Sequence, residues 1–321
     1  MHTFSELAQL FEQKFSNDHF PARPRNLYDA ARHILTIGGK RIRPVCVLLA
    51  NELFGDLHED SFHAASAVEL FHNFSLIHDD ILDNAPLRRG VETVHVKYGK
   101  SAALLAGDVM LVAAYQQLSK AGAEFLPGLL QLFNTTSRQV CEGQQMDMDF
   151  EEYTDVNMET YLEMITGKTS VLLACSLQMG AIIGGAGVGN QEHLYEFGKN
   201  LGIAFQVQDD YLDAYGDPKK FGKQVGGDIL SNKKTFLWIH AYEASTEKNK
   251  ALLNQLLTEN SPDKVEKVLK IYNDCGMEEW ASSLKEKYYS QAIDHLEAVA
   301  VLSSRKSKLQ ELASYLMQRQ N

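Results

Sequence analysis

Apolar residues recur every three or four positions along most of this chain, and this helical spacing is the feature that most restricts its fold. Strand-like alternation is scarce. Several of the helical segments are apolar almost all round, which is typical of the centre of a large helical bundle. The clearest are "NLYDAARHILTI", "SFHAASAVELFHNFSLIHDDIL", "SAALLAGDVMLVAAYQQLSKA", "ETYLEMITGKTSVLLACSLQMGAII" and "HLYEFGKNLGIAFQVQDDYLDAY". The pattern predicts an all-α fold, with residues 1–321 forming a single domain.

The charge balance restricts the possible partners. The chain of 321 residues has a net charge of −11, which argues against nucleic acid because nucleic acid needs a broad basic surface. An anionic small substrate remains possible, since local lysines and arginines or bound cations can override the net field. No uncharged apolar run reaches the ~18 residues that span a bilayer, so we expect no stable membrane insertion. The four cysteines form no CxxC pair, which favours reduced thiols and a cytoplasmic location.

One acidic motif, D-D-x-x-D, occurs twice, each time on an apolar helical segment. Residues four apart share a face of a helix, so the first and last aspartate of each motif stack, with the middle one about 100° round. Like charges so placed destabilise a bare helix, and hard cations such as Mg2+ reverse this. A solvated acidic helix end would explain a single copy, but two copies, each trailed by basic residues, favour metal sites. The predicted ligands are Asp79, Asp80, Asp83, Asp209, Asp210 and Asp213.

Basic residues form the second half of this pattern. Arginine suits bidentate phosphate contacts, and lysine acts as a point charge. Each one taken singly is better explained as a surface charge, but together with the aspartates they predict a diphosphate site. They are Lys40, Arg41 and Arg43 in "GGKRIRP", Arg88 and Arg89 in "APLRRG", Lys168 in "TGKTS", Lys223 in "FGKQVGGD" and Lys233 and Lys234 in "NKKT".

Lys168 differs from the other basic residues because it lies inside an apolar helix. A lysine between Ile165 and Val171 on a buried helix needs an anionic partner. Gly167 and Thr169 beside it indicate a helix break. Such a break would turn a backbone carbonyl inward, where its dipole could stabilise a developing positive charge.

Two neutral polar residues share helix faces with the aspartates. His72 lies seven residues before Asp79, which places it two turns away on nearly the same face of the helix. This position fits either a phosphate contact or a core histidine. Gln206 lies three residues before Asp209. Ordinary polar packing would explain it, but its place on the face of the cluster favours a position lining the reacting centre.

In combination these residues resemble a known family. The match runs, in the family's order and spacing, through "GGKRIRP", "ELFHNFSLIHDDILDNAPLRRG", "AGDVML", "GQQMDMDFE", "GKT", "GIAFQVQDDYLD", "FGKQVGGDI" and "NKKT". The family is that of the trans-isoprenyl diphosphate synthases, the head-to-tail prenyltransferases also called polyprenyl synthetases. The resemblance covers residues 25–240, and the final "LQELASYLMQRQ" is similar to the family's last helix.

The resemblance implies a bundle of helices around a deep central cavity, assembled as a homodimer. The two aspartate clusters would bind about three Mg2+ ions that bridge an allylic diphosphate. By matching motifs, the residues that hold this allylic diphosphate would be Arg88, Lys168 and Lys223. Those that hold isopentenyl diphosphate would be Lys40, Arg43, His72 and Arg89. Lys233 matches the family's later basic position.

The implied mechanism follows from these charges. Metal ions and basic residues neutralise the diphosphate as the allylic C–O bond ionises. The allylic cation would lie near the backbone carbonyl of Lys168, Thr169 and Gln206, and the double bond of isopentenyl diphosphate would attack it. The released diphosphate would then take up the proton, so the extension by five carbons needs no general base from the protein.

The resemblance also bears on product length. The growing chain would run down the helix that carries Asp79, past Ser75, Phe74 and then Phe71. In this family a bulky residue five positions before the first motif limits the product, and Phe74 holds that position. The motif also lacks the two-residue insertion typical of bacterial farnesyl synthases. The expected product is geranylgeranyl diphosphate; farnesyl diphosphate and longer chains are alternatives, and core packing is the alternative role for either phenylalanine.

Two other functional classes use similar motifs. A terpene cyclase would replace the second motif with an N/D-x-x-S/T-x-x-x-E pattern and would not need "GGKRIRP" for a second diphosphate. A non-catalytic subunit of a synthase would lose one of the two aspartate clusters. Both clusters are intact here, which favours a catalytic prenyltransferase.

Overall fold

The computed structural model describes residues 1–15, 19–153, 156–216, 226–259 and 261–318. Over these residues the chain is helical apart from turns and one short antiparallel hairpin, in which Leu87 pairs with Glu92 and Arg88 with Val91. The predicted all-α class is confirmed. None of the described helices is both long and apolar enough to cross a membrane.

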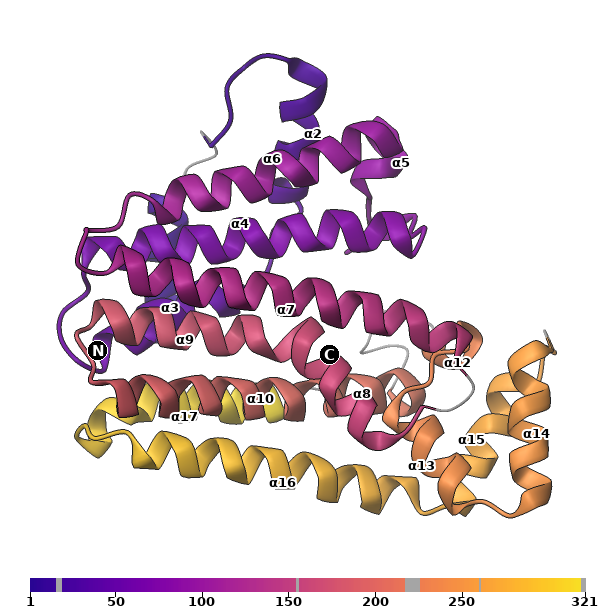
Figure 1. Cartoon of the computed structure of the whole chain (residues 1–321). Coiled ribbons are helices and arrows are strands. Elements are labelled where there is room, and N and C mark those ends of the chain that lie inside the picture. Colours follow the sequence, from indigo (N-terminus) through magenta and orange to yellow (C-terminus); the bar gives the residue numbers. More distant parts are fainter. Residues whose placement is uncertain (16–18, 154–155, 217–225, 260, 319–321) are drawn as a thin grey trace. The chain divides into compact units, whose positions relative to one another are not determined.

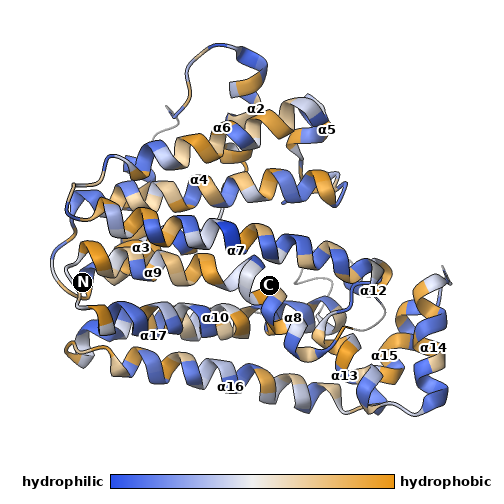
Figure 2. Cartoon of the chain, in the orientation of Figure 1, coloured by the Kyte–Doolittle hydropathy of each residue, from blue (hydrophilic) through white to orange (hydrophobic). Residues whose placement is uncertain are grey.

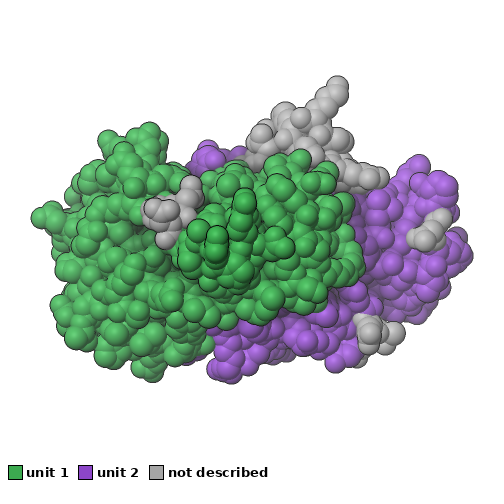
Figure 3. Space-filling model, turned by 90° about the horizontal axis from the view of Figure 1, so that it is seen from above, with its two compact units in different colours: residues 1–134, 175–194, 301–308 green, residues 135–174, 195–300, 309–321 purple. Residues whose placement is uncertain are grey.

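The residues group into two compact units, coloured green and purple in Figure 3. Unit 1 comprises residues 1–134, 175–194 and 301–308, and unit 2 comprises residues 135–174, 195–300 and 309–321. Four helices, α7, α9, α10 and α17, contribute residues to both units. The single domain with a deep central cavity that the sequence suggests stays a prediction.

Unit 1 holds the helices of the first part of the chain (Figure 1). They are α1 (Phe4–Lys14), α2 (Arg25–Thr36), α3 (Ile42–Glu52), α4 (Glu59–Leu82), α5 (Val94–Tyr98) and α6 (Lys100–Leu118), with the hairpin strands β1 (Leu87–Arg88) and β2 (Val91–Glu92). The first third of α7 (Leu126–Glu152), the start of α17 (Ser303–Met317), most of α9 (Val171–Ile183) and the start of α10 (Val188–Tyr215) complete it.

Helices α4 and α6 lie side by side in unit 1 (Figure 1). The buried face of α6 consists largely of small residues, including Ala103, Ala106, Gly107 and Ala114. Gly107 lies so close to α4 that a Cβ atom there would be 2.2 Å from Nε2 of His78. Glycine at this position thus leaves room for the imidazole of His78, which lies one residue before the first aspartate motif.

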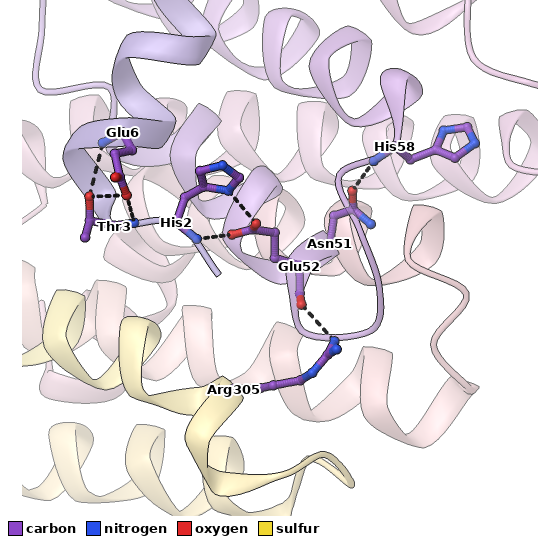
Figure 4. Close-up of polar contacts among 7 residues, drawn as sticks. All are labelled: His2, Thr3, Glu6, Asn51, Glu52, His58 and Arg305. Atoms are coloured by element: carbon purple, nitrogen blue, oxygen red, sulfur yellow. Dashed lines mark hydrogen bonds and ion pairs between the residues drawn. The ribbon is translucent and has the colours of Figure 1, made fainter.

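Contacts between distant segments anchor the beginning of the chain (Figure 4). Thr3 and Glu6 form a capping box at the start of α1, in which the Glu6 carboxylate accepts from the Thr3 backbone N–H at 2.7 Å. The Glu52 carboxylate at the end of α3 accepts from the backbone N–H of His2 at 3.0 Å. Arg305 of α17 donates to the Glu52 carbonyl at 3.2 Å. These bonds join α1, α3 and α17 within unit 1.

Helix α9 packs tightly against α3 in unit 1. It is coloured orange over much of its length in Figure 2, because its sequence is almost wholly apolar. A Cβ atom on Gly180 would lie 2.0 Å from the carbonyl oxygen of Val47, so the two backbones are in contact there.

Two of the four free cysteines, Cys46 and Cys175, are buried, whereas Cys141 is exposed.

Arg41, directly before α3, is buried. Its backbone adopts the left-handed conformation, with φ 52°. Its guanidinium donates to Glu12 at 2.5 Å and to the buried carboxylate of Glu69, which also accepts from Asn73. A buried carboxylate without such a partner would be strongly unfavourable. Arg41 therefore has a structural role, unlike its exposed neighbour Lys40.

Unit 2 holds the helices of the second part of the chain. Besides the last two thirds of α7, most of α10 and the larger part of α17, these are α8 (Met158–Ile165), the π-helical turn η1 (Thr166–Ser170), α12 (Gly227–Leu230), α13 (Phe236–Ala244), α14 (Glu247–Thr258), α15 (Lys264–Asp274) and α16 (Met277–Ala298). Its core includes the rings of Tyr161 and Phe236, and the partly buried ring of Trp280 stacks on Phe236 at a centroid distance of 5.6 Å.

Replacing Arg41 with Met should lower the free energy of unfolding by about 3–5 kcal/mol, because the charge of Glu69 would remain buried without its partner. Chemical denaturation measures this loss. The double variant R41M/E69M should recover much of it, because no uncompensated charge remains. A loss below about 1 kcal/mol for R41M would show that this ion pair does not stabilise the fold.

Candidate active site

Four carboxylates meet in one cavity of unit 2. Asp209, Asp210 and Asp213 lie within one turn of α10, and Asp228 at the start of α12 joins them. The backbone N–H of Asp228 donates to the Asp213 carboxylate at 2.9 Å, so the second motif itself fixes the start of α12. The cavity has a volume of about 210 Å³. The second predicted cluster is therefore assembled, with one further acid that the motif does not include.

Asp210 is the most buried of the four. Its carboxylate accepts a hydrogen bond from the Tyr161 hydroxyl at 2.5 Å and another from the Gln206 amide at 2.7 Å. Burial and the charge of Asp228 raise its pKa to about 8. So many carboxylates in a buried cavity resist ionisation together, and a bound divalent cation would reverse this effect.

Lysines reach the same cavity from other elements. Lys168 Nζ donates to the Asp147 carboxylate on α7 at 2.5 Å, which supplies the anionic partner that its position requires. Lys233 Nζ lies 3.8 Å from Oδ1 of Asp228. Lys234 instead donates to the backbone carbonyl of Phe150 at 2.6 Å, near the end of α7. All three lysines line the cavity, Lys168 and Lys233 as ion-paired cations and Lys234 with its ammonium bonded to the backbone of α7.

The helix break expected around Lys168 is present as the π-helical turn η1. In this turn the Val171 N–H donates to the Thr166 carbonyl, five residues back, so one extra residue is inserted between α8 and α9. The Thr169 hydroxyl donates to the Gln206 side-chain oxygen at 3.2 Å. Lys168, Thr169 and Gln206, which the sequence predicts near the reacting centre, all line the same cavity.

The first aspartate motif lies at the end of α4 in unit 1. Asp80 is buried and accepts hydrogen bonds from Nε and Nη2 of Arg88, with distances from 2.7 to 3.1 Å. Asp79 is half-buried, and Asp83 is exposed at the C-cap, directly after the last residue of α4. A predicted metal ligand and a predicted phosphate-binding arginine are thus direct neighbours, joined by the fold of the hairpin β1–β2 that follows α4.

A group of basic residues forms a second site in unit 1. Arg43 Nη1 lies 3.2 Å from His72 Nε2, and Arg43 Nε is buried without a hydrogen-bond partner among the described residues. Loss of hydration and the charge of Arg43 hold the pKa of His72 well below its ordinary value. A Cβ atom on Gly39 would lie 3.1 Å from the guanidinium of Arg89, so glycine there leaves room for that arginine.

The electrostatics of this basic group favour an anion. Loss of hydration, followed by the charge of Arg88, lowers the pKa of Arg89. An unpaired buried N–H on Arg43 and mutual repulsion among the cations would both be relieved by the oxygens of a diphosphate. The burial and mutual repulsion of Arg43, His72 and Arg89 therefore support the binding of a diphosphate at this site.

The three residues expected to set chain length lie on α4 as predicted. Phe71 is fully buried and contacts the Phe133 ring at a centroid distance of 5.3 Å. Phe74 is half-buried, with its ring 5.4 Å from Phe71 and 4.8 Å from the imidazole of His78. Ser75 donates its hydroxyl to the His72 carbonyl. Phe74 is therefore the more accessible of the two rings.

One predicted site residue, Lys223, lies outside the described residues. Reasoning from sequence missed the cavity residues Asp147, Tyr161 and Asp228. Asp147 lies in "GQQMDMDFE", one of the motifs that carry the resemblance, so its acidic residues were a usable signal. Tyr161 had no signal, because nothing in a single sequence pairs it with Asp210.

Metal binding by the clusters needs ligands beyond the protein. Within the described ranges, no group of three or more His, Cys, Asp or Glu side chains is arranged to hold an ion by itself. Mg2+ is usually held by one or two carboxylates together with substrate phosphates and water. The carboxylates of α10, with the cavity beside them, suit this kind of shared coordination better than a closed protein site.

The His72→Gln variant should flatten the pH dependence of unfolding. Because the folded-state pKa of His72 is depressed, the unfolded chain binds more protons below about pH 6.5, and stability should fall as the pH falls from about 7 to about 5. This one group contributes up to about 1.4 kcal/mol per pH unit. Denaturation at several pH values measures the slope. His63→Gln on the same helix is the control, and an unchanged slope in His72→Gln would contradict the assignment.

Comparisons with known proteins identify the family of the chain. A family model described as polyprenyl synthetase matches residues 24–275. A geranylgeranyl diphosphate synthase of Sulfolobus acidocaldarius is 39% identical and covers 91% of both chains. A short chain isoprenyl diphosphate synthase of Methanothermobacter thermautotrophicus is 35% identical, covering 99% of this chain and 97% of that one. A crystal structure of a geranylgeranyl pyrophosphate synthase superimposes with a TM-score of 0.94 and 40% identity over the whole of both chains. The chain belongs to the polyprenyl synthetase family of prenyltransferases.

Proposed function

We propose that this prenyltransferase uses Mg2+ to condense isopentenyl diphosphate with an allylic diphosphate, head to tail, and that its main product is geranylgeranyl diphosphate. The observation that carries the proposal is the cavity of unit 2. There, four carboxylates lie beside Lys168 and Lys233 and against a π-helical turn. This combination suits a metal-bound diphosphate whose leaving generates a carbocation.

The allylic diphosphate would be held by the acidic cavity. Asp209, Asp210 and Asp213 would bind Mg2+, with Asp79, Asp80 and Asp83 serving further ions, about three in all. Bound Mg2+ would neutralise charge on the diphosphate as the C–O bond breaks. Lys168, whose ammonium Asp147 fixes in place, would contact the same phosphate oxygens. Arg88 and Lys223 are proposed for the same diphosphate.

The reacting carbons would lie against uncharged polar groups. Thr169 and Gln206 hydrogen-bond to each other, and Gln206 is further fixed by its bond to Asp210. Oxygen dipoles held in place need no reorganisation when positive charge develops nearby, so they stabilise the allylic cation without capturing it. The π-helical turn supports this role, because such turns leave backbone carbonyls outside the regular helical pattern.

Isopentenyl diphosphate would be bound by the basic group of unit 1. The four residues proposed are Lys40, Arg43, His72 and Arg89. The buried, unpaired Nε of Arg43 and the depressed pKa of His72 support an anionic ligand at this site. A neutral imidazole can donate one hydrogen bond to a phosphate while accepting one from Arg43.

The twenty-carbon product rests on Phe74. Its ring is half-buried, whereas Phe71 one turn deeper is fully buried against Phe133, so Phe74 is better placed to meet a growing chain. Farnesyl diphosphate is the second candidate, and longer chains are the third.

The proposal also includes a homodimer in the cytoplasm. Exposed Leu105 and Val112, two turns apart on one face of α6, support a surface that a second copy could cover.

Product analysis tests the proposal. Purified protein with labelled isopentenyl diphosphate, Mg2+ and each allylic primer should stop at twenty carbons, and Phe74→Ala should make longer products because the barrier is removed. Phe71→Leu is the matched control and should leave product length unchanged. A fifteen-carbon product from the wild type would place the barrier nearer the diphosphate. An unchanged product from Phe74→Ala would show that another residue sets the length, and no turnover would refute the catalytic assignment.

A further inference from the structure

The π-helical turn that carries Lys168 and Thr169 is in backbone contact with two glycines from neighbouring helices of unit 2. A Cβ atom on Gly143 of α7 would lie 2.2 Å from the backbone nitrogen of Lys168. A Cβ atom on Gly202 of α10 would lie 2.8 Å from both Cα and Cβ of Ser170. Both glycines are buried. Neither helix could lie this close to the turn with any larger residue at these positions.

The turn contributes a small residue of its own to the first contact. A Cβ atom on Gly167 would lie 3.2 Å from Cα of Gly143 and 2.8 Å from the carbonyl oxygen of Gln139. The atoms involved are mostly backbone atoms, which cannot swing aside as a flexible side chain can. A methyl group at Gly143 would therefore have to move the turn or the helix.

Each glycine lies one helical turn before the residue that hydrogen-bonds to the turn. Gly143 and Asp147 are four apart on α7, and Asp147 accepts from Lys168. Gly202 and Gln206 are four apart on α10, and Gln206 accepts from Thr169. Residues four apart share a helix face, so each close approach also brings the next polar side chain within hydrogen-bond distance.

We propose that Gly143 and Gly202 are positioning residues for prenyl transfer: they let α7 and α10 approach the π-helical turn closely enough for Asp147 and Gln206 to orient Lys168 and Thr169. This inference rests on the proposed function, because it assigns the two glycines to the same reaction. Glycine is unfavourable inside a helix, so two glycines within long helices need a packing reason, and these contacts provide it.

Other glycines of the same helices serve as matched controls. Gly128 of α7 would place a Cβ atom 4.0 Å from Ile182, an ordinary contact, and Gly189 of α10 would place one with nothing within 4 Å. Gly180 of α9 is a control of matched severity, since its Cβ atom would lie 2.0 Å from the Val47 carbonyl in unit 1. Gly180→Ala should lower stability without a specific effect on the turn.

The experiment compares G143A and G202A with G128A, G189A and G180A as full-length proteins. Thermal unfolding gives the folded fraction, and steady-state kinetics give kcat and the KM of each substrate. The inference predicts that kcat per folded enzyme falls about 10²-fold in G143A and G202A, since a misplacement of about 1 Å can have that effect. The KM of isopentenyl diphosphate should stay unchanged, because its proposed residues belong to unit 1. The three controls should keep wild-type kcat per folded enzyme.

A double variant tests whether Gly143 acts through Asp147. If it does, G143A/D147N should be little worse in kcat than the poorer single variant, because both changes remove the same contact. If the losses of kcat in the two single variants add up in the double variant, Gly143 does not act through Asp147. Wild-type kcat in G143A and G202A, or a loss matched by G180A, would overturn the inference itself. If G143A does not fold, G202A decides the question. An inactive wild type would instead refute the proposed function.

Discussion

The accumulation of carboxylates around α10 is the constraint on which the rest of unit 2 depends. Asp209, Asp210, Asp213 and Asp228 line one cavity, and Asp210 is buried. Like charges in a desolvated place are unfavourable unless cations or hydrogen-bond donors compensate them. The surrounding elements supply these groups: Tyr161 and Gln206 donate to Asp210, and the backbone of α12 donates to Asp213. The divalent cations proposed for this site would compensate the remaining negative charge.

Unit 1 presents the opposite imbalance. Arg43, Arg88 and Arg89 lie near His72, whose pKa they help to depress, and a buried N–H of Arg43 has no partner among the described residues. One set of residues thus requires cations and the other requires an anion. A diphosphate with its metal ions and a second, metal-free diphosphate would satisfy these two requirements respectively. This pairing explains why a chain with a net charge of −11 keeps such a basic group.

Local pattern was sufficient to predict several of the long helices. The segment "SFHAASAVELFHNFSLIHDDIL" falls within α4, and "NLYDAARHILTI" agrees with α2 to within one residue, because their apolar spacing directly reports the buried face. The helix break at Lys168 was also predictable from Gly167 and Thr169. Its π-helical form was not, since an inserted residue depends on what packs against the turn.

Tertiary contacts account for what the sequence could not predict. The two aspartate motifs were visible, but the contact of Asp80 with Arg88 depends on the hairpin that follows α4. Asp147 was overlooked because its lysine partner lies 21 residues away. The different burial of Phe71 and Phe74 likewise depends on Phe133, which comes from another helix. Roles that depend on such contacts rest on the structure and on the family resemblance together.

Calorimetric titration with a non-ionising thiodiphosphate analogue of the allylic substrate tests the central claim most directly. If, as proposed, the acidic cavity binds a diphosphate only through divalent cations, the titration should give binding heat with Mg2+ and none when Mg2+ is chelated. Asp209→Asn should bind the analogue more weakly at equal Mg2+ concentration. Equal affinity with and without Mg2+ would contradict this proposal, because the carboxylates would then have no part in holding the substrate.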